Sequence, residues 1–276
     1  MSYLRVNNVS FRYPSVNYNA LTNITLDLPL GEIIAIIGQN GAGKTTLAKI
    51  LIGLLHPTSG SVEIDNEQHE KFSIAELATK IGYVYQNPNI MLFSDTVEKE
   101  LFLSLQTFPL TKLQKTEKVT DMLEFFNLTT FKDHHPRLLS RGQKQKLALA
   151  SILIKDPSVL IFDEPFSGID FKQRDLIISY INELKLRNKL ILLISHNLDL
   201  ILKNSDRTIA LQKGKLISNS PTKTFFSDPK IFEKITLGLS PMLQLIYNLH
   251  ECNLPESILT PEALISFFSE KKTPRD

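Results

Sequence analysis

The stretch Gly38-Gln39-Asn40-Gly41-Ala42-Gly43-Lys44-Thr45 matches the pattern G-x-x-x-x-G-K-[ST], which is typical of a phosphate-binding loop between a strand and a helix. It lies between a continuous apolar run, Ile33 to Ile37, and a segment that carries apolar residues at helical spacing. The backbone amides of such a glycine-rich loop, together with the start of the helix, surround the phosphates of a nucleotide. The sequence therefore predicts a site for a nucleoside triphosphate and Mg²⁺ between a buried strand and a helix.

The residues of this loop have separate expected roles. Its glycines let the backbone wrap closely around phosphate groups. Lys44 would reach the β- and γ-phosphates, Thr45 would offer its hydroxyl to Mg²⁺, and Thr46 could bond a further phosphate oxygen. The loop residues that we predict to bind the nucleotide are Gly38, Asn40, Gly41, Ala42, Gly43, Lys44, Thr45 and Thr46.

Two carboxylates, Asp163 and Glu164, end a second apolar run, Val159 to Phe162. Ligands of a parallel α/β sheet bind at the carboxyl ends of its strands, so Asp163 is expected near Mg²⁺ and Thr45. Glu164 would lie beside the γ-phosphate and could polarise the attacking water. Two solvated charges at a strand end are the alternative interpretation, which the loop upstream disfavours.

His196 and Gln86 follow two other apolar segments. His196 comes after Leu190 to Ile194, and Gln86 comes after Ile81 to Val84. A His at such a place is more often a packing residue and a single Gln is more often polar surface, so both roles depend on the complete set of motifs. The predicted catalytic residues are Glu164, His196 and Gln86, and the predicted Mg²⁺ ligands are Thr45, Gln86 and Asp163.

Length and composition limit the function classes. The chain has 276 residues, a net charge of +2 and one Cys, which fits one large domain, or one domain plus a small extension, in a reducing compartment. The near-neutral charge gives no reason to expect nucleic acid as a partner. No apolar stretch approaches the ~18–20 residues of a membrane span, and the N-terminus lacks a signal-peptide pattern. We therefore expect a soluble intracellular protein.

Apolar runs alternate with helical patterns along the chain, which predicts an α/β fold with a parallel sheet. A small helical C-terminal extension is expected from residue 221, where prolines divide short amphipathic segments. Strands are expected over residues 3–13, 22–28, 33–37, 159–162, 190–194 and 207–211, and residues 61–84 are interpreted as strands around a polar loop. Helices are expected after Lys44 and over residues 96–154, 171–187, 242–249 and 263–268.

The segment Leu139-Ser140-Arg141-Gly142-Gln143 resembles the LSGGQ signature of ABC ATPases. The order of the motifs also resembles that family: the phosphate-binding loop, Gln86, the signature, the carboxylates, Ser167-Gly168-Ile169-Asp170 and then His196. Tyr13 resembles the aromatic residue that stacks on adenine in the same family. The further nucleotide-binding residues that this resemblance implies are Tyr13, Ser140, Gly142, Gln143 and Asp170.

The resemblance implies an ABC-type P-loop NTPase with a RecA-like core, an N-terminal antiparallel β subdomain, a helical signature subdomain and a small helical C-terminal extension. Residues 1–220 would form the ATPase domain, with the helical subdomain at about 87–155, and residues 221–276 would form the extension, which we expect to dimerise. ATP and Mg²⁺ are the implied cofactors. Two such subunits would form a head-to-tail dimer that ATP closes, each ATP lying between the loop of one subunit and the signature of the other.

Arg141 departs from the signature, which has Gly at this position. The backbone amide remains available, but a long charged side chain would lie near the closed dimer interface. Arg141 could clash there, or it could fold outward or pair with phosphate. We expect mild impairment of the composite site to which this subunit contributes its signature.

Three further segments resemble the energy-coupling-factor (ECF) transporter ATPases, a group that includes cobalt and nickel importers. These matches are less specific than the ATPase motifs. Leu254 to Leu264 is similar to the tail of that group, and residues 9–14 and 85–88 look like its corresponding segments. A non-transport ABC ATPase that acts as a soluble regulatory or assembly module is the alternative. The transported substrate, a vitamin or a metal ion, would be recognised by another protein.

The ECF resemblance also implies partners. A second ATPase subunit, often non-identical, would work with this one on a transmembrane coupling protein and a substrate-binding membrane protein. The chain would then lie peripherally on the cytoplasmic side of the cell membrane. The residues that we expect to contact the coupling protein are Leu92, Phe93, Asp95, Thr96 and Val97.

Overall fold

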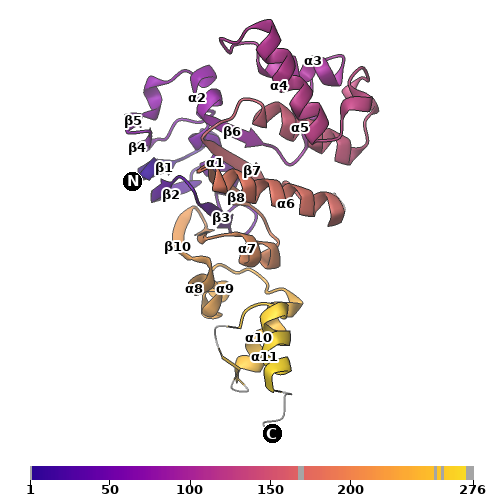
Figure 1. Ribbon diagram of the computed structural model, residues 1–276. Coiled ribbons are helices and arrows are strands. Elements are labelled where there is room, and N and C mark those ends of the chain that lie inside the picture. Colours follow the sequence, from indigo (N-terminus) through magenta and orange to yellow (C-terminus); the bar gives the residue numbers. More distant parts are fainter. Residues whose placement is uncertain (1, 167–170, 252–253, 256–257, 272–276) are drawn as a thin grey trace.

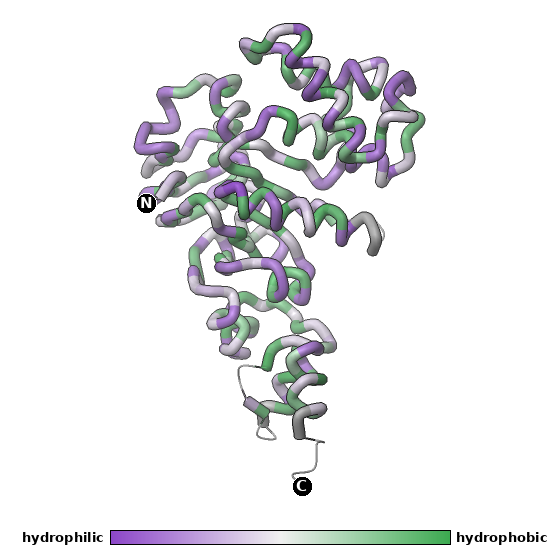
Figure 2. Tube along the Cα trace, in the orientation of Figure 1, coloured by the Kyte–Doolittle hydropathy of each residue, from purple (hydrophilic) through white to green (hydrophobic). Residues whose placement is uncertain are grey.

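The chain folds around two sheets, with one group of helices at the top and another at the bottom of the view in Figure 1. The computed structural model describes residues 2–166, 171–251, 254–255 and 258–271. Hydrophobic residues concentrate along the inner strands, whereas the outlying loops and helices carry many hydrophilic ones (Figure 2). Within the described residues, no helix combines the length and the apolar character that crossing a membrane would need.

The central sheet is built from short apolar strands. Its six strands lie in the order β10-β9-β3-β8-β7-β6, and β3 (Ile33–Ile37), β8 (Leu190–Ile194) and β7 (Val159–Asp163) run parallel. Every residue of β3 and β8 is buried, as is usual for parallel strands that are covered on both faces. These three predicted strands are confirmed, and their carboxyl ends lie at the same edge of the sheet.

One edge of this sheet departs from the prediction. The strands β6 (Ile81–Val84) and β9 (Arg207–Gln212) continue the parallel arrangement, but β10 (Lys215–Pro221) runs antiparallel to β9. The prediction of a parallel sheet was therefore wrong at this edge, where the sheet is mixed. No residue of β10 is fully buried, which explains why its sequence lacks the apolar alternation that identifies a strand.

A second, antiparallel sheet packs beside the first. Its order is β2-β1-β4-β5, and its main strands β1 (Ser2–Phe11) and β2 (Leu21–Pro29) agree with the predicted strands to within two residues. The strands β4 (Ser59–Ile64) and β5 (Glu67–Gln68) complete it. Buried residues of this sheet share one core cluster with residues of β3, so the two sheets hold each other in place.

Residues 61–84 contain a helix that the sequence interpretation missed. After a 3₁₀ turn, η1 (His69–Lys71), the chain forms α2 (Ile74–Lys80). The interpretation of this segment as strands around a loop was wrong between β5 and β6. A capping box starts α2, since Ser73 and Glu76 each accept from the other's backbone amide. Only Leu77 of the helix is buried, so an apolar period could not reveal it.

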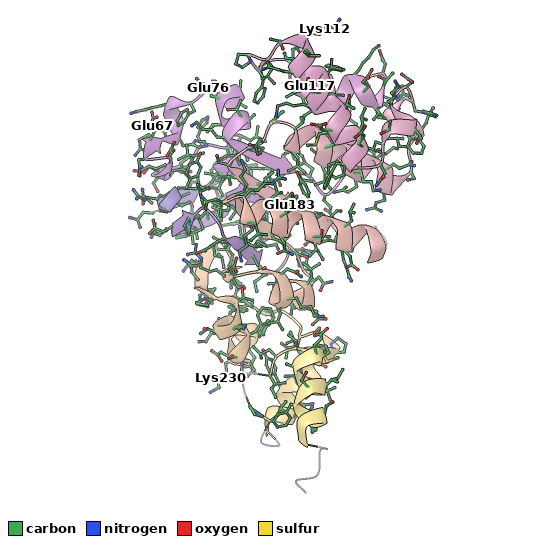
Figure 3. The ribbon with its side chains drawn as sticks, in the orientation of Figure 1. Glu67, Glu76, Lys112, Glu117, Glu183 and Lys230 are labelled. Carbon is green, nitrogen blue, oxygen red and sulfur yellow. The ribbon has the colours of Figure 1, made fainter. Side chains whose placement is uncertain are left out.

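The helices at the top of Figure 1 lie between β6 and β7 in the sequence. The helical pattern predicted for residues 96–154 is confirmed, although it is divided by turns. Their buried apolar side chains form a cluster that reaches Phe162 of β7, and Lys112 projects outward at the far end (Figure 3). The elements are η2 (Pro88–Ile90), α3 (Val97–Ser104), α4 (Lys112–Phe125), η3 (Thr129–Phe131), η4 (Pro136–Leu138) and α5 (Arg141–Leu153).

The remaining helices connect the strands or follow the last one. In Figure 1 the last helices lie at one end of the molecule, and α4 lies at the other end. The rings of Phe225, Phe226 and Phe232 contact one another edge to face or at a tilt, and they pack in one cluster with Ala35 and Ile37 of β3. The helices are α1 (Lys44–Leu51), α6 (Phe171–Leu186), α7 (Leu198–Asn204), α8 (Thr222–Ser227), α9 (Lys230–Lys234), α10 (Pro241–Glu251) and α11 (Pro261–Lys271).

Gly82 of β6 fixes the distance between the central sheet and α5. A Cβ atom at Gly82 would lie 2.5 Å from Cγ2 of Ile152 and 3.0 Å from Cδ2 of Leu160. We predict that Gly82→Ala lowers the free energy of unfolding by about 1–3 kcal/mol, because the added methyl group overpacks this contact. Urea denaturation measures the change. Gly238→Ala is the matched control, since nothing lies within 4 Å of its Cβ position, and equal losses in both variants would contradict the prediction.

Candidate functional site

The carboxyl ends of the parallel strands border a cavity of about 1450 Å³. Loops from both sheets contribute to its wall. Concave sites with a few convergent polar groups are the usual form of small-molecule sites. The sequence-predicted residues that the structure brings together here are Tyr13, Asn40, Gly41, Gly43, Lys44, Thr45, Thr46, Gln86, Asp163, Glu164 and His196.

The loop between β3 and α1 needs glycine at two positions in particular. Gly38 has a φ of +150°, and a Cβ atom there would lie 2.2 Å from the carbonyl oxygen of Leu211. Gly43 has a φ of +105°, and its Cβ would lie 2.8 Å from the carbonyl oxygen of Ala20. Any other residue would strain the backbone and clash. Gly38 and Ala42 do not line the cavity, so they belong to the frame of the loop.

Lys44 is buried and the loop itself holds its ammonium group. Its Nζ donates to the carbonyl oxygens of Gly38 at 2.6 Å and Gln39 at 3.0 Å. Burial lowers the pKa of Lys44, while Glu164 and Asp163 act in the opposite direction. Because the side chain is only 7% exposed, water screens its positive charge little, and the charge can attract an anionic phosphate in the cavity.

Three elements meet at one carboxylate oxygen, Oδ2 of Asp163. The hydroxyl of Thr45, in the first turn of α1, donates to it at 3.3 Å. The hydroxyl of Tyr83, on β6, donates to it at 2.6 Å. The carboxylate at the end of β7 is therefore oriented from two sides and points toward the phosphate-binding loop.

The donors of Thr45 and Asp163 fit Mg²⁺ by their chemistry. Mg²⁺ takes hard oxygen ligands, and it usually combines one or two protein carboxylates with waters and substrate phosphates. In the part of the chain that the structure describes, no group of three or more His, Cys, Asp and Glu side chains could hold a metal without such help. When bound, Mg²⁺ would supply charge neutralisation on the phosphates.

Glu164 lies beside Asp163 in a strained, half-buried position. Its φ is +52°, and its amide donates to the carbonyl oxygen of Ile194 at 2.9 Å. Burial, and then the charge of Asp163, raise the pKa of Glu164 to about 7. His196 Nε2 lies 3.3 Å from Oε1 of Glu164, and burial lowers the pKa of His196. A carboxyl group with a pKa near 7 is well suited to accept a proton at neutral pH.

Tyr13 forms the wall of the cavity on the side of the antiparallel sheet. Its ring meets the ring of Phe11 edge to face at a centroid distance of 4.8 Å, and its hydroxyl lies 3.2 Å from Oγ1 of Thr46. The ring is half-buried and borders open space. It is therefore placed where a planar base could stack, next to the loop that would hold the phosphates.

The signature residues lie apart from this cavity. Ser140 starts α5 with a capping box, because the Gln143 amide donates to its Oγ at 3.3 Å and its own amide donates to Gln143 Oε1 at 2.8 Å. Ser140, Gly142 and Gln143 are absent from the lining of the cavity. One copy of the chain therefore does not bring its signature to its own phosphate-binding loop, and Asp170 lies outside the described residues.

Gln86 connects the cavity with the region of the signature. It lines the large cavity and also a hollow of about 400 Å³, whose wall includes Arg141 and Lys144 of α5. The basic side chain that replaces Gly in the signature thus lies near the segment that follows β6. The expected mild impairment of a composite site by Arg141 stays a prediction.

Sequence reasoning missed Tyr83, Tyr85 and Lys213, which also line the cavity. The signal for the first two was present, since Tyr83 and Tyr85 stand two positions apart in the segment that leads to the predicted residue Gln86. Their rings meet at 4.4 Å in an edge-on contact. That Tyr83 reaches Asp163 depends on the neighbouring positions of β6 and β7, which the sequence order does not reveal.

Comparisons with known proteins identify relatives of this chain. A family model described as ABC transporter matches residues 21–167. The energy-coupling factor transporter ATP-binding protein EcfA1 of Mycoplasmopsis synoviae is 35% identical over 83% of this chain and 87% of its own length. EcfA1 of Mycoplasmopsis pulmonis has the same identity and coverage. The chain spans less than half the length of other curated relatives, such as an ABC transporter ATP-binding protein of Onion yellows phytoplasma that is 34% identical over 97% of this chain and 45% of its own length.

Solved structures show the same arrangement of elements. CbiO1 from Clostridium perfringens, part of the ABC transporter complex CbiONQ, superposes with a TM-score of 0.75 at 28% identity and covers 89% of this chain and 99% of its own. The dimeric cassette MJ0796, bound to ADP and Pi, superposes with a TM-score of 0.71 at 25% identity over 79% of this chain and 98% of its own. These similarities confirm the fold class predicted from the sequence.

Tyr83→Phe removes the hydroxyl that orients Asp163 and keeps the buried ring. We predict that a divalent cation binds the nucleotide complex about three- to ten-fold more weakly, because one hydrogen bond worth about 0.5–1.5 kcal/mol is lost at its ligand. Titration of the chain and ADP with Mn²⁺, followed by electron paramagnetic resonance, measures this affinity. Tyr85→Phe is the matched control, and an unchanged or tighter Mn²⁺ affinity in Tyr83→Phe would contradict the prediction.

Proposed function

Because this chain belongs to the ABC transporter family, as one of its ATP-binding cassettes, we propose that it binds and hydrolyses ATP to power an ECF-type importer of a vitamin or a metal ion. The observation that carries the proposal is the meeting of Lys44, Thr45, Asp163 and Glu164 in one cavity. The similarity to two EcfA1 proteins supports the transporter type.

In the proposed reaction, water attacks the γ-phosphorus of ATP and the bond to the ADP oxygen breaks. Lys44 and the loop amides would hold the phosphates. Thr45 and Asp163 would hold Mg²⁺, which would neutralise part of the negative charge of the phosphates. Glu164 would take the proton of the attacking water, for which its pKa of about 7 is well placed. His196, 3.3 Å from Glu164, and Gln86 would help to orient that water.

We also propose that the working site is shared between two subunits. The amino end of α5 presents Ser140 and the amides of the signature outward from the cavity of its own chain. In a head-to-tail pair they would face the γ-phosphate held by the partner, where a helix N-terminus favours an anion. Closure would then depend on the γ-phosphate, because that group lies between two positive sites.

We propose that the chain consists of an ATPase domain and a C-terminal extension. Residues 1–220 would form the ATPase domain, and residues 221–276 would form an extension that contacts the second subunit. Exposed apolar side chains on the last two helices support such a contact: Leu245 of α10 is 48% exposed, and Ile265 and Phe268 of α11 are 66% and 47% exposed.

A docking place for the transmembrane coupling protein lies on the helices between β6 and β7. Phe93 is 77% exposed and borders a hollow of about 520 Å³ together with Asp95, Lys99, Phe102 and Leu103. Exposed apolar side chains that rim a hollow are typical of protein contacts. We propose that Leu92, Phe93, Asp95 and Thr96 meet the coupling protein here, which would hold the chain at the cytoplasmic face of the membrane. The expectation that Val97 belongs to this contact was wrong, because its side chain is fully buried at the start of α3.

Glu164→Gln replaces the proposed base by an amide of the same shape. We predict that ATP still binds, that hydrolysis falls about 10²- to 10⁴-fold, and that the two-subunit form accumulates in ATP, because the proton acceptor is lost. Phosphate release and size-exclusion chromatography measure these effects. Lys44→Ala is the comparison variant, in which nucleotide binding itself should weaken, and normal turnover in Glu164→Gln would remove Glu164 from its role.

Membrane association is tested by purification of the chain with its partners. We predict that a tagged chain brings an integral membrane protein with it from detergent extracts and that Phe93→Asp weakens this association, because a charge enters an apolar contact. Leu186→Asp, at a site that is 85% exposed on α6, is the matched control. Recovery of a stable complex without any membrane protein would favour a non-transport ABC ATPase instead.

A further inference from the structure

Thr236 ends helix α9 in a backbone conformation that its side chain disfavours. Its φ is +54°. The Thr236 amide donates to the carbonyl oxygen of Glu233 at 3.1 Å, and the Leu237 amide donates to the carbonyl oxygen of Phe232 at 3.1 Å. These two bonds form a Schellman motif, in which the left-handed position is usually Gly and sometimes Asn. A β-branched residue is strained there, so the helix end alone does not explain Thr236.

Other helix ends of this chain show which residue types occupy the left-handed position that closes a helix. Helices α4 and α6 are closed by the same pair of bonds, with Asn127 and Asn188 at the left-handed position. Among the described residues other than Gly, all those with positive φ are Asn or Asp except Glu164, Lys213 and Thr236. Glu164 and Lys213 line the nucleotide cavity. Strained residues of this kind tend to cluster at functional sites.

Two glutamine side chains, from the phosphate-binding loop and from the end of β9, hold Thr236. Gln39, in the phosphate-binding loop, donates through Nε2 to the carbonyl oxygen of Thr236 at 2.5 Å. Gln212, the last residue of β9, donates through Nε2 to Oγ1 of Thr236 at 2.9 Å. A Gly or Asn at this position would close the helix but would offer Gln212 no hydroxyl. The strained residue thus provides two acceptors to two partners.

The contact continues into the loop. The carbonyl oxygen of Gln39 accepts from Nζ of Lys44 at 3.0 Å, so the Gln39 residue is tied on one side to the buried cation and on the other to Thr236. The turn after Gln212 is attached to the same loop, because the Gly214 amide donates to the carbonyl oxygen of Ala42 at 3.1 Å. The orientation of the loop is therefore fixed from α9 as well as from the sheet.

We propose that Thr236 is a positioning residue for the phosphate-binding loop, through which the segment after the ATPase sheet prepares the nucleotide site. Its backbone carbonyl oxygen holds Gln39 of the loop, and its hydroxyl holds Gln212, before the turn that is bonded to Ala42 of the same loop. Thr236 itself touches no nucleotide. A loop that is ordered before the nucleotide arrives loses less freedom on binding, which raises affinity. The inference rests on nucleotide binding at this site and not on the membrane partner.

Thr236→Gly separates this role from a structural one. The variant relieves the backbone strain, so it should unfold at the same denaturant concentration as the wild type or a higher one. ADP should nevertheless bind about three- to ten-fold more weakly, since the variant loses the bond from Gln212 to the Thr236 hydroxyl while the bond from Gln39 to the backbone carbonyl remains. Thr236→Ser keeps the hydroxyl and should bind ADP like the wild type. Fluorescence titration with a labelled ADP measures the affinities.

The remaining variants make the test specific. Asn127→Gly, at the matching end of α4, should leave ADP affinity unchanged. Gln212→Ala should weaken ADP binding as Thr236→Gly does, and the double variant should be no weaker than Gln212→Ala, because both remove the bond between Gln212 and the Thr236 hydroxyl. Unchanged ADP affinity in Thr236→Gly, or an equal loss in Asn127→Gly, would overturn the inference. A wild-type chain that fails to bind ADP would instead overturn the proposed function.

Discussion

The register of three parallel strands is the constraint on which the site depends. Ile194 of β8 pairs with Ile36 of β3 on one side and with Asp163 of β7 on the other. The phosphate-binding loop, the carboxylates and His196 therefore begin at the same level of the sheet. A one-residue slip of β7 would turn its side chains to the opposite faces of the sheet and would carry Asp163 away from Thr45. The proposed cation site therefore requires this pairing of the strands.

The charged groups of the site lie close together because this register aligns the strand ends. One buried cation, Lys44, lies near two carboxylates, and the pKa of Glu164 rises to about 7 because burial and Asp163 both disfavour its charge. Adjacent buried carboxylates are costly when both are ionised, and proton uptake by one of them lowers that cost. The arrangement leaves Asp163 to hold a cation with Thr45 and leaves Glu164 free to exchange a proton.

Much of this could be predicted from local sequence. The glycine loop, the buried strands and the residues that follow them each carry a signal within a few positions, and parallel pairing brings them to one edge. α2 and β10 were missed because neither has a buried apolar face of its own. Tyr83 and Thr236 were missed for another reason, since their partners Asp163 and Gln39 are distant in sequence and only the packed fold brings them together.

The central claim is that Asp163 and Thr45 hold Mg²⁺ on a nucleotide bound by the loop after β3. Calorimetric titration of ATP into the wild-type chain and into Asp163→Asn, each with and without Mg²⁺, tests it most directly. We expect Mg²⁺ to strengthen ATP binding to the wild type and to have little effect on Asp163→Asn, which should still bind ATP alone through Lys44 and the loop. An equal strengthening by Mg²⁺ in both proteins would contradict it.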